Sequence, residues 1–268
     1  MRRVLKRILF TVAGLVAVPV VAVGALLLGG CSQLSTFNAV IPHDNGGGLV
    51  AEDIAYGPEE RHRLDVYRPD AADAAPVLFF IYGGSWNSGS KTDYAFVGRA
   101  FAAQGFVTVI ADYRLVPEVR YPDFVRDGAR ALAWARKSAT RFGGDPEQIF
   151  LLGHSAGAYN AMMLALEPDF LDEVGLSPDA VTAAAGLSGP YDFLPLARDS
   201  TRAAFAHAPE LEKTQPVNLV RQDAPPILLA TGADDSLVGR KNIENLTARL
   251  KDAGIRHRSI VYPGVDHA

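Results

Sequence analysis

The sequence has 268 residues, of which 49% are hydrophobic and 21% are charged, a composition typical of one globular α/β domain. Its formal net charge is −4, and no basic stretch follows the first seven residues, which argues against a nucleic-acid-binding protein. The sequence has no internal repeat and no low-complexity tract, so we expect neither a solenoid nor a disordered scaffold.

The first 31 residues have the pattern of an export or anchoring segment. MRRVLKR is strongly basic, and residues 8–28 then run for 21 positions without a charge. A helix needs about 20 apolar residues to cross a bilayer, so this segment is long enough to span one. The same pattern fits a signal peptide with a long apolar region. Both alternatives place the rest of the chain on the extracytoplasmic side of a membrane.

Cys31 bears on the choice between these alternatives. It is the single cysteine of the chain and lies in LGGC directly after the apolar run. This stretch resembles the lipobox of bacterial lipoproteins, which implies cleavage before Cys31 and its acylation. A disulfide is excluded because the chain has no second cysteine. Residues 32–48 are interpreted as a linker, and residues 49–268 as the folded domain.

The remainder of the chain alternates between apolar runs and helical patterns. Such alternation predicts an α/β fold with a mostly parallel central sheet and helices on both faces. Ligands bind at the carboxyl ends of the strands in such sheets, so the loops after residues 82, 153, 232 and 262 are expected to share one edge. In chain order we predict strands over 63–69, 76–84, 106–114, 148–153, 181–189, 225–232 and 258–264, and helices over 122–140, 158–167 and 242–254.

Gly153-His154-Ser155-Ala156-Gly157 lies between a predicted strand and a predicted helix. It matches G-x-S-x-G, the nucleophile elbow, in which a sharp turn presents the serine hydroxyl above the sheet. Small residues on either side of the serine let the strand and helix pass closely. The amide of Ala156, at the start of the helix, is placed to stabilise an oxyanion. We therefore predict that Ser155 is a catalytic nucleophile.

A serine nucleophile needs a histidine base, and elbow enzymes place the acid and then the histidine after the serine. Of the six histidines, only His207, His257 and His267 follow the elbow. His207 precedes the acidic candidates, and His257 opens a strand at the wrong end. His267 follows the carboxyl end of the last predicted strand and is therefore the predicted base. For the acid, ATGADDSLV offers Asp234 and Asp235, which spacing alone does not separate.

Several motifs occur in an order that resembles the α/β-hydrolase superfamily, within it the esterase/lipase group that includes hormone-sensitive-lipase-like and bifunctional feruloyl/acetyl-xylan esterase-like enzymes. The resemblance extends over roughly residues 50 to 268. The acid of that family usually lies in G-x-x-D-x-x-V, which matches Gly232, Asp235 and Val238, so the resemblance implies Asp235 as the acid, with Asp234 as the alternative. The matching blocks are YGGSW (82–86), DYRLVPE (112–118), FGGDPEQIFLLGHSAGA (142–158), LSGPYD (187–192), TGADDSLV (231–238) and YPGVDH (262–267).

The chain departs from the family pattern at two places. The oxyanion block is normally H-G-G, and here its first residue is Tyr82. The resemblance still implies that the amides of Gly83 and Gly84 bind the oxyanion together with Ala156, and the hydrogen bond of the missing histidine passes to the Tyr82 hydroxyl or is lost. Family members also usually continue into a closing helix, so the resemblance implies further residues after Ala268.

The resulting hypothesis is a serine carboxylesterase for short acyl or aryl esters that uses no metal and no cofactor. Residues 190–224 are too short for a large lid and are expected to line or cover the acyl pocket, with Tyr191 among them. Trp86 is interpreted either as flanking the site or as a buried structural residue. Partners are a small ester substrate and a membrane reached through the N-terminus. The alternatives are an arylformamidase-like amide hydrolase, which shares the H-G-G-x-W block, and a catalytically impaired membrane-anchored binding protein.

Overall fold

The computed structural model describes residues 38, 41 and 45–267 of the chain. The strands are β1 (Gly47–Ala55), β2 (Arg63–Pro69), β3 (Ala75–Ile81), β4 (Val107–Ala111), β5 (Gly144–His154), β6 (Ala183–Leu187), β7 (Ile227–Gly232) and β8 (His257–Tyr262). The helices are α3 (Ala95–Ala103), α4 (Asp123–Ser138), α5 (Ala156–Leu166), α6 (Asp169–Asp172), α7 (Asp199–Phe205) and α8 (Lys241–Asp252), with short 3₁₀ turns between them.

These strands form one sheet of eight strands in the order β1-β2-β4-β3-β5-β6-β7-β8. The first two pairings, β1 with β2 and β2 with β4, are antiparallel, and every pairing from β4 to β8 is parallel. Phe80 of β3 lies beside Leu152 of β5, which in turn lies beside Ala185 of β6. Because the six strands from β4 to β8 are parallel, their carboxyl ends share one edge of the sheet.

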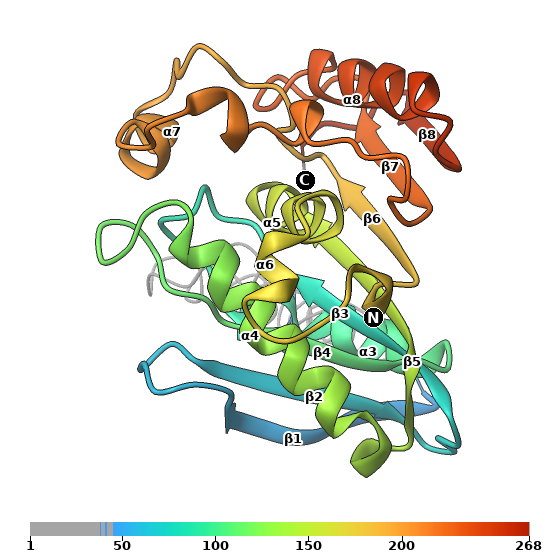
Figure 1. Cartoon of the computed structure of the whole chain (residues 1–268). Helices are drawn as coiled ribbons and strands as arrows, with labels where there is room; N and C mark the ends of the chain where they lie inside the picture. Colours follow the sequence, from blue (N-terminus) through green and yellow to red (C-terminus); the bar gives the residue numbers. More distant parts are fainter. Residues whose placement is uncertain (1–37, 39–40, 42–44, 268) are drawn as a thin grey trace, which may run out of the picture.

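Helices cover the sheet on both faces, with α4, α5 and α6 in front of it and α3 behind it in Figure 1. All eleven residues of α5 are buried, so this helix runs through the centre of the core directly after Ser155. The α8 helix is amphipathic and buries Ile243, Leu246 and Leu250 on one side, which is the spacing of one helical face. This layered arrangement is the α/β-hydrolase fold that the sequence predicts.

The predicted elements from residue 63 onward have counterparts in the structure, and the strand over 63–69 has the predicted bounds. That strand is not at the edge of the sheet, because β1 lies beyond it and pairs with it. This strand begins at Gly47, within the predicted 32–48 linker, and its pairing with β2 contains two register shifts. Both β1 and α3 were missed because neither shows a regular apolar period.

The N-terminal end of the described chain contacts the domain. The side-chain amide of Asn38 donates to the Thr92 carbonyl at 2.6 Å and accepts from Arg99 of α3 at 2.8 Å. Cys31 and the apolar segment 8–28 lie outside the described residues, so the prediction of an anchor remains a prediction. Within the described ranges, no helix is both long and apolar enough to cross a bilayer.

Candidate active site

Ser155 occupies a sharp turn between β5 and α5. Its φ of 54° and ψ of −123° lie in a region that residues other than glycine rarely adopt. A Cβ at Gly153 would lie 2.2 Å from the Gly157 carbonyl oxygen, and one at Gly157 would lie 2.0 Å from the Ile81 carbonyl oxygen. The backbone N–H of Ser155 donates to the Leu187 carbonyl at 2.8 Å and fixes the turn to β6. The flanking glycines are therefore required by the close approach of strand, turn and helix.

The structure brings Ser155, His267 and Asp235 together at the edge where the parallel strands end. His267 Nε2 lies 2.8 Å from Ser155 Oγ, and His267 Nδ1 lies 2.9 Å from Asp235 Oδ2. The loops after β7 and β8 meet closely, because a Cβ at Gly232 would lie 2.1 Å from the Val265 carbonyl oxygen. This approach lets two strand-end loops deliver the carboxylate and the imidazole to one hydroxyl.

Asp235 is held as an ionised carboxylate by hydrogen bonds to its two oxygens. Burial raises the pKa of this carboxyl, but hydrogen bonds from the Val238 amide, from His267 and from the Leu237 amide outweigh it and hold the pKa below its ordinary value. The two amides donate to Oδ1 at 2.9 and 3.0 Å, which leaves Oδ2 for the imidazole. Asp234, the alternative acid, is exposed, and its amide donates to the Val265 carbonyl.

His154 supports the backbone of His267. Burial is the main cause that lowers the pKa of the His154 ring, so the ring is neutral at pH 7. Its Nε2 lies 3.2 Å from the His267 carbonyl oxygen and its Nδ1 lies 3.1 Å from the Tyr94 hydroxyl. A neutral ring satisfies both contacts when Nε2–H donates to the carbonyl and Nδ1 accepts from the hydroxyl. The G-x-S-x-G motif contains His154, but it does not predict this contact.

The loop after β3 passes directly over the elbow. A Cβ at Gly83 would lie 2.9 Å from the Ser155 Cβ, and Gly84 has a φ of 126° with the Ser88 carbonyl oxygen 2.2 Å from an added Cβ. Ser85 and Trp86 follow with φ values of 51° and 60°, which are unusual for residues with side chains. Glycine and strained conformations let the backbone of this loop approach the serine.

The backbone of Gly83, one of the three predicted oxyanion donors, contacts the Tyr94 hydroxyl. Burial raises the pKa of Tyr94, and this contact lowers it in part. Ser85 lines the cavity at Ser155 together with Ala156. Its place in the cavity wall was not predicted, because the residue type does not show that this serine has a positive φ. The hydroxyl of Tyr82, the first residue of this block, donates to Asp112 at 2.8 Å.

A small cavity of about 130 Å³ opens beside Ser155. Trp86 forms part of its wall and is held by a 3.2 Å hydrogen bond from its indole N–H to Asn160. Tyr191 is only 1% exposed and does not belong to the cavity wall. The lining residues are Ser85, Trp86, Ser155, Ala156, Pro190, Phe193, Ala197, Arg198, Ser200, Thr201, Leu237, Val238 and Asn242. Six of these thirteen residues lie within 190–201, part of the segment 190–224 that is expected to line the pocket.

The described part of the chain contains no group of three or more histidine, cysteine, aspartate or glutamate side chains placed to hold a metal ion. From Ser155 at the cavity wall, a hydroxyl, an imidazole and a carboxylate are connected in series by hydrogen bonds. This order allows proton transfer from the hydroxyl to the imidazole, with the resulting positive charge stabilised by the carboxylate. The arrangement is suited to nucleophilic acyl transfer.

Comparison with known proteins agrees with this chemistry. The BD-FAE family model matches residues 64–250. A probable isoprenylcysteine alpha-carbonyl methylesterase from Oryza sativa subsp. japonica is 31% identical over 81% of this chain and 58% of its own length. The esterase LipC from Mycobacterium tuberculosis is 30% identical over 80% of this chain and 58% of its own length. The chain therefore spans a little over half the length of these curated relatives.

Solved structures share the fold. Esterase B from Lactobacillus rhamnosis superposes with a TM-score of 0.77 at 20% identity, covering 93% of this chain and 86% of that one. A butyrate-bound thermophilic esterase from Thermogutta terrifontis gives a TM-score of 0.69 at 25% identity, covering 84% of this chain and 85% of that one. The first of these similarities supports the fold alone, because its sequence identity is low.

Proposed function

Because this chain belongs to the BD-FAE family, we propose that it is a serine carboxylesterase that hydrolyses short-chain acyl or aryl esters. The observation that carries the proposal is the hydrogen-bonded series from Ser155 through His267 to Asp235, at a cavity beside the serine hydroxyl. The esterase names of the relatives and neighbouring structures support the same reaction class.

In the proposed reaction, Ser155 Oγ attacks the ester carbonyl carbon while His267 Nε2 accepts the hydroxyl proton. Asp235 stabilises the imidazolium that forms. Collapse of the tetrahedral intermediate breaks the bond to the alcohol, which leaves with the proton from His267. Water then attacks the acyl-serine while His267 accepts its proton. The bond to Ser155 Oγ breaks, the carboxylic acid is released, and the proton from His267 restores the serine hydroxyl.

The oxyanion of this intermediate needs amide donors at the serine. We assign them to Ala156 and to the Gly84–Ser85 part of the loop, because Ser85 and Ala156 line the cavity beside Ser155, whereas Gly83 does not. Removal of one donor of this kind typically costs about 3 kcal/mol of transition-state stabilisation. This proposed set differs from the sequence-based set of Gly83, Gly84 and Ala156 in having Ser85 in place of Gly83.

The proposed substrate preference rests on the size and composition of the cavity. A volume of about 130 Å³ with a mainly apolar wall suits an acyl group of a few carbons. The butyrate bound to the Thermogutta terrifontis esterase has an acyl group of this size. A long acyl chain would have to extend past residues 190–201 into solvent.

The proposal is tested with chromogenic acetate, butyrate and octanoate esters and with N-formylkynurenine, using Ser155→Ala as the control. A carboxylesterase hydrolyses acetate or butyrate best and loses turnover in the variant. Preference for N-formylkynurenine would instead identify an arylformamidase-like enzyme. Absence of any serine-dependent turnover would leave a catalytically impaired binding protein.

We also propose that the N-terminal segment tethers this domain to a membrane through an acylated Cys31. The support is the sequence pattern alone, a basic start followed by 21 uncharged residues and LGGC. Labelling with a fatty-acid probe tests it, because Cys31→Ser abolishes incorporation if the cysteine is acylated. Membrane retention of an unlabelled Cys31→Ser variant would indicate a membrane-spanning helix instead.

A further inference from the structure

The loop that carries the proposed oxyanion donors is tied at both ends by two charged residues. One nitrogen of Arg61, Nη2, lies 2.8 Å from the Tyr82 hydroxyl and 2.9 Å from the Gly89 carbonyl oxygen. One oxygen of Asp112, Oδ1, accepts from the Tyr82 hydroxyl and from the Lys91 amide, each at 2.8 Å. Both side chains therefore bridge the start and the end of the segment 82–91.

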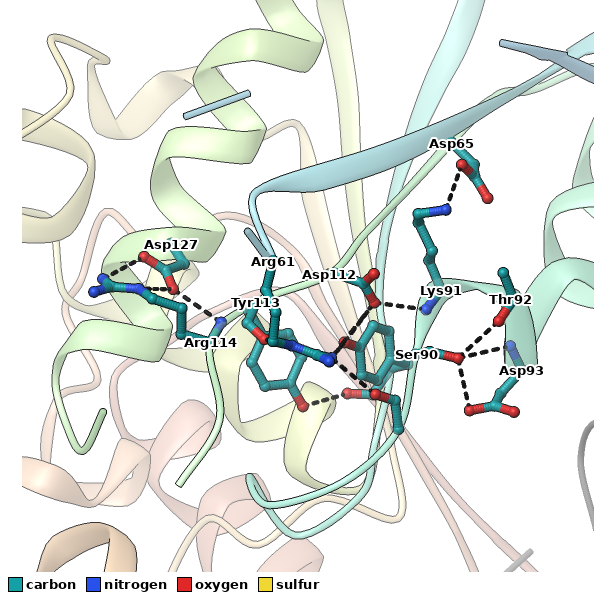
Figure 2. Close-up of polar contacts among 12 residues, drawn as sticks. Arg61, Asp65, Ser90, Lys91, Thr92, Asp93, Asp112, Tyr113, Arg114 and Asp127 are labelled. Atoms are coloured by element: carbon teal, nitrogen blue, oxygen red, sulfur yellow. Dashed lines mark hydrogen bonds and ion pairs between the residues drawn. The ribbon is translucent and has the colours of Figure 1, made fainter. Parts of the chain in front are cut away.

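Arg61 and Asp112 are themselves fixed by other elements. Arg61 follows β1, its Nε donates to the Tyr113 carbonyl at 2.8 Å, and its Nη2 lies 3.6 Å from Asp112. The Tyr113 hydroxyl donates to the Tyr82 carbonyl at 3.0 Å. Figure 2 shows the Arg61 guanidinium on one side of the Asp112 carboxylate and the Lys91 amide on the other. The Lys91 ammonium pairs elsewhere, with Asp53 and Asp65 at 2.7 and 2.8 Å.

The segment between these ties is strained. Gly84, Ser85 and Trp86 all have positive φ, at 126°, 51° and 60°. A non-glycine residue in this region costs on the order of 1–3 kcal/mol and persists only when its surroundings hold it in place. Relaxation of such a loop would turn its amides away from Ser155. The strained residues lie between the tied residues Tyr82 and Gly89, which links the ties to the position of the oxyanion donors.

We propose that Arg61 is a positioning residue that, with Asp112, holds the two ends of the segment 82–91 together and so positions the oxyanion donors within it. This inference rests on the proposed esterase function. Arg61 is absent from the cavity wall and acts through the backbone between Tyr82 and Gly89. Loss of the guanidinium removes both of its loop contacts at once and leaves the largely buried Asp112 without its ion-pair partner among the described residues. The expected consequence is misplaced oxyanion donors in the transition state, with substrate binding largely unchanged.

The test compares Arg61→Ala with Arg136→Ala in the full chain. Arg136 is a matched control because its side chain is 26% exposed against 29% for Arg61, and it also contacts a backbone carbonyl and a carboxylate, far from the site in α4. With a butyrate ester, we expect Arg61→Ala to lower kcat about 10- to 100-fold and to leave KM within about threefold. The control keeps the wild-type kcat.

Two further readouts separate positioning from general stability. A trifluoromethyl ketone, which mimics the tetrahedral intermediate, is expected to lose affinity in Arg61→Ala by the same factor as kcat. Methylguanidinium is expected to restore part of kcat in this variant and to leave Arg136→Ala unchanged. Equal kcat values for the two variants, or a loss of kcat that only follows the unfolded fraction, would overturn the proposal.

Hydrogen exchange of the peptide covering 83–89 gives a measurement that does not depend on esterase activity. Faster exchange is expected there in Arg61→Ala than in Arg136→Ala, because the loop loses its ties. Unchanged exchange would contradict the inference even in an active enzyme. Faster exchange in a protein that hydrolyses no ester would support the ties while rejecting the proposed function, so the two failures are distinguishable.

Discussion

Replacement of Asp235 by asparagine tests the assignment of the acid with little change in shape. The two Oδ1 contacts, to the Leu237 and Val238 amides, favour an asparagine oriented with its oxygen at that position. Its NH₂ group then faces His267 Nδ1, where the carboxylate oxygen accepted at 2.9 Å. Two donors cannot face each other, so the imidazole carries its proton on Nε2 instead and cannot accept from Ser155.

The expected loss of activity is large because the base is present in the wrong tautomer. In Ser-His-Asp enzymes this change lowers kcat about 10⁴-fold, or about 5.5 kcal/mol of transition-state stabilisation. The assay is hydrolysis of a butyrate ester under saturating conditions. The matched control is Asp234→Asn, at the exposed neighbouring position, which is expected to stay within about twofold of wild type. An inactive Asp234→Asn beside an active Asp235→Asn would refute the assignment.

The Asp235→Asn variant also tests how the Asp235 carboxylate contributes to stability at different pH values. The folded-state pKa of Asp235 lies below its ordinary value, so the ionised carboxylate contributes stability above the unfolded-state pKa of about 3.9, and this contribution is lost as the pH falls through the folded-state value. The difference in unfolding free energy between wild type and Asp235→Asn should therefore be constant near neutrality and shrink below about pH 4. A difference that grows on acidification would contradict the sign of the shift.

Two further predictions concern packing at the elbow and in the cavity. Gly157→Ala would place its Cβ 2.0 Å from the Ile81 carbonyl oxygen and is expected to lower the free energy of unfolding by more than about 3 kcal/mol. Gly128→Ala, with its nearest contact at 3.4 Å, is expected to raise this free energy by about 0.5–1 kcal/mol. Both values are measured by denaturant unfolding. Equal effects of the two substitutions would contradict the steric argument. Phe193→Ala enlarges the cavity beside Trp86 and should raise the hexanoate-to-butyrate ratio of kcat/KM severalfold, while an unchanged ratio would show that the acyl chain binds elsewhere.

Much of the central sheet was predictable because its strands are buried runs of apolar residues. The strand over 63–69 follows from its alternating residues, and the helices over 122–140 and 242–254 follow from apolar residues at helical spacing. In contrast, β1 leaves Leu49 and Val50 about half exposed and depends on its pairing with β2. A strand that is stabilised mainly by pairing with its neighbour has no clear pattern of apolar residues in its sequence.

The residues of the site also differ in how well the sequence predicts them. Ser155 was predictable from a local motif, and His267 from chain order and the direction of the last strand. Choosing Asp235 over Asp234 needed the family resemblance, because both lie in the same loop. The hydrogen bond between Arg61 and Tyr82 joins side chains that are 21 positions apart in the sequence, so no local sequence pattern predicts it.

The most direct test of the central claim is to identify the residue that carries the acyl group during turnover. The full chain is mixed with a slowly hydrolysed aryl ester, quenched in acid and analysed as intact protein and as peptides. The account predicts one acyl group per chain on Ser155, formed with a burst of the aryl alcohol and absent in Ser155→Ala. An acyl group on another residue, or undiminished hydrolysis by Ser155→Ala, would contradict it.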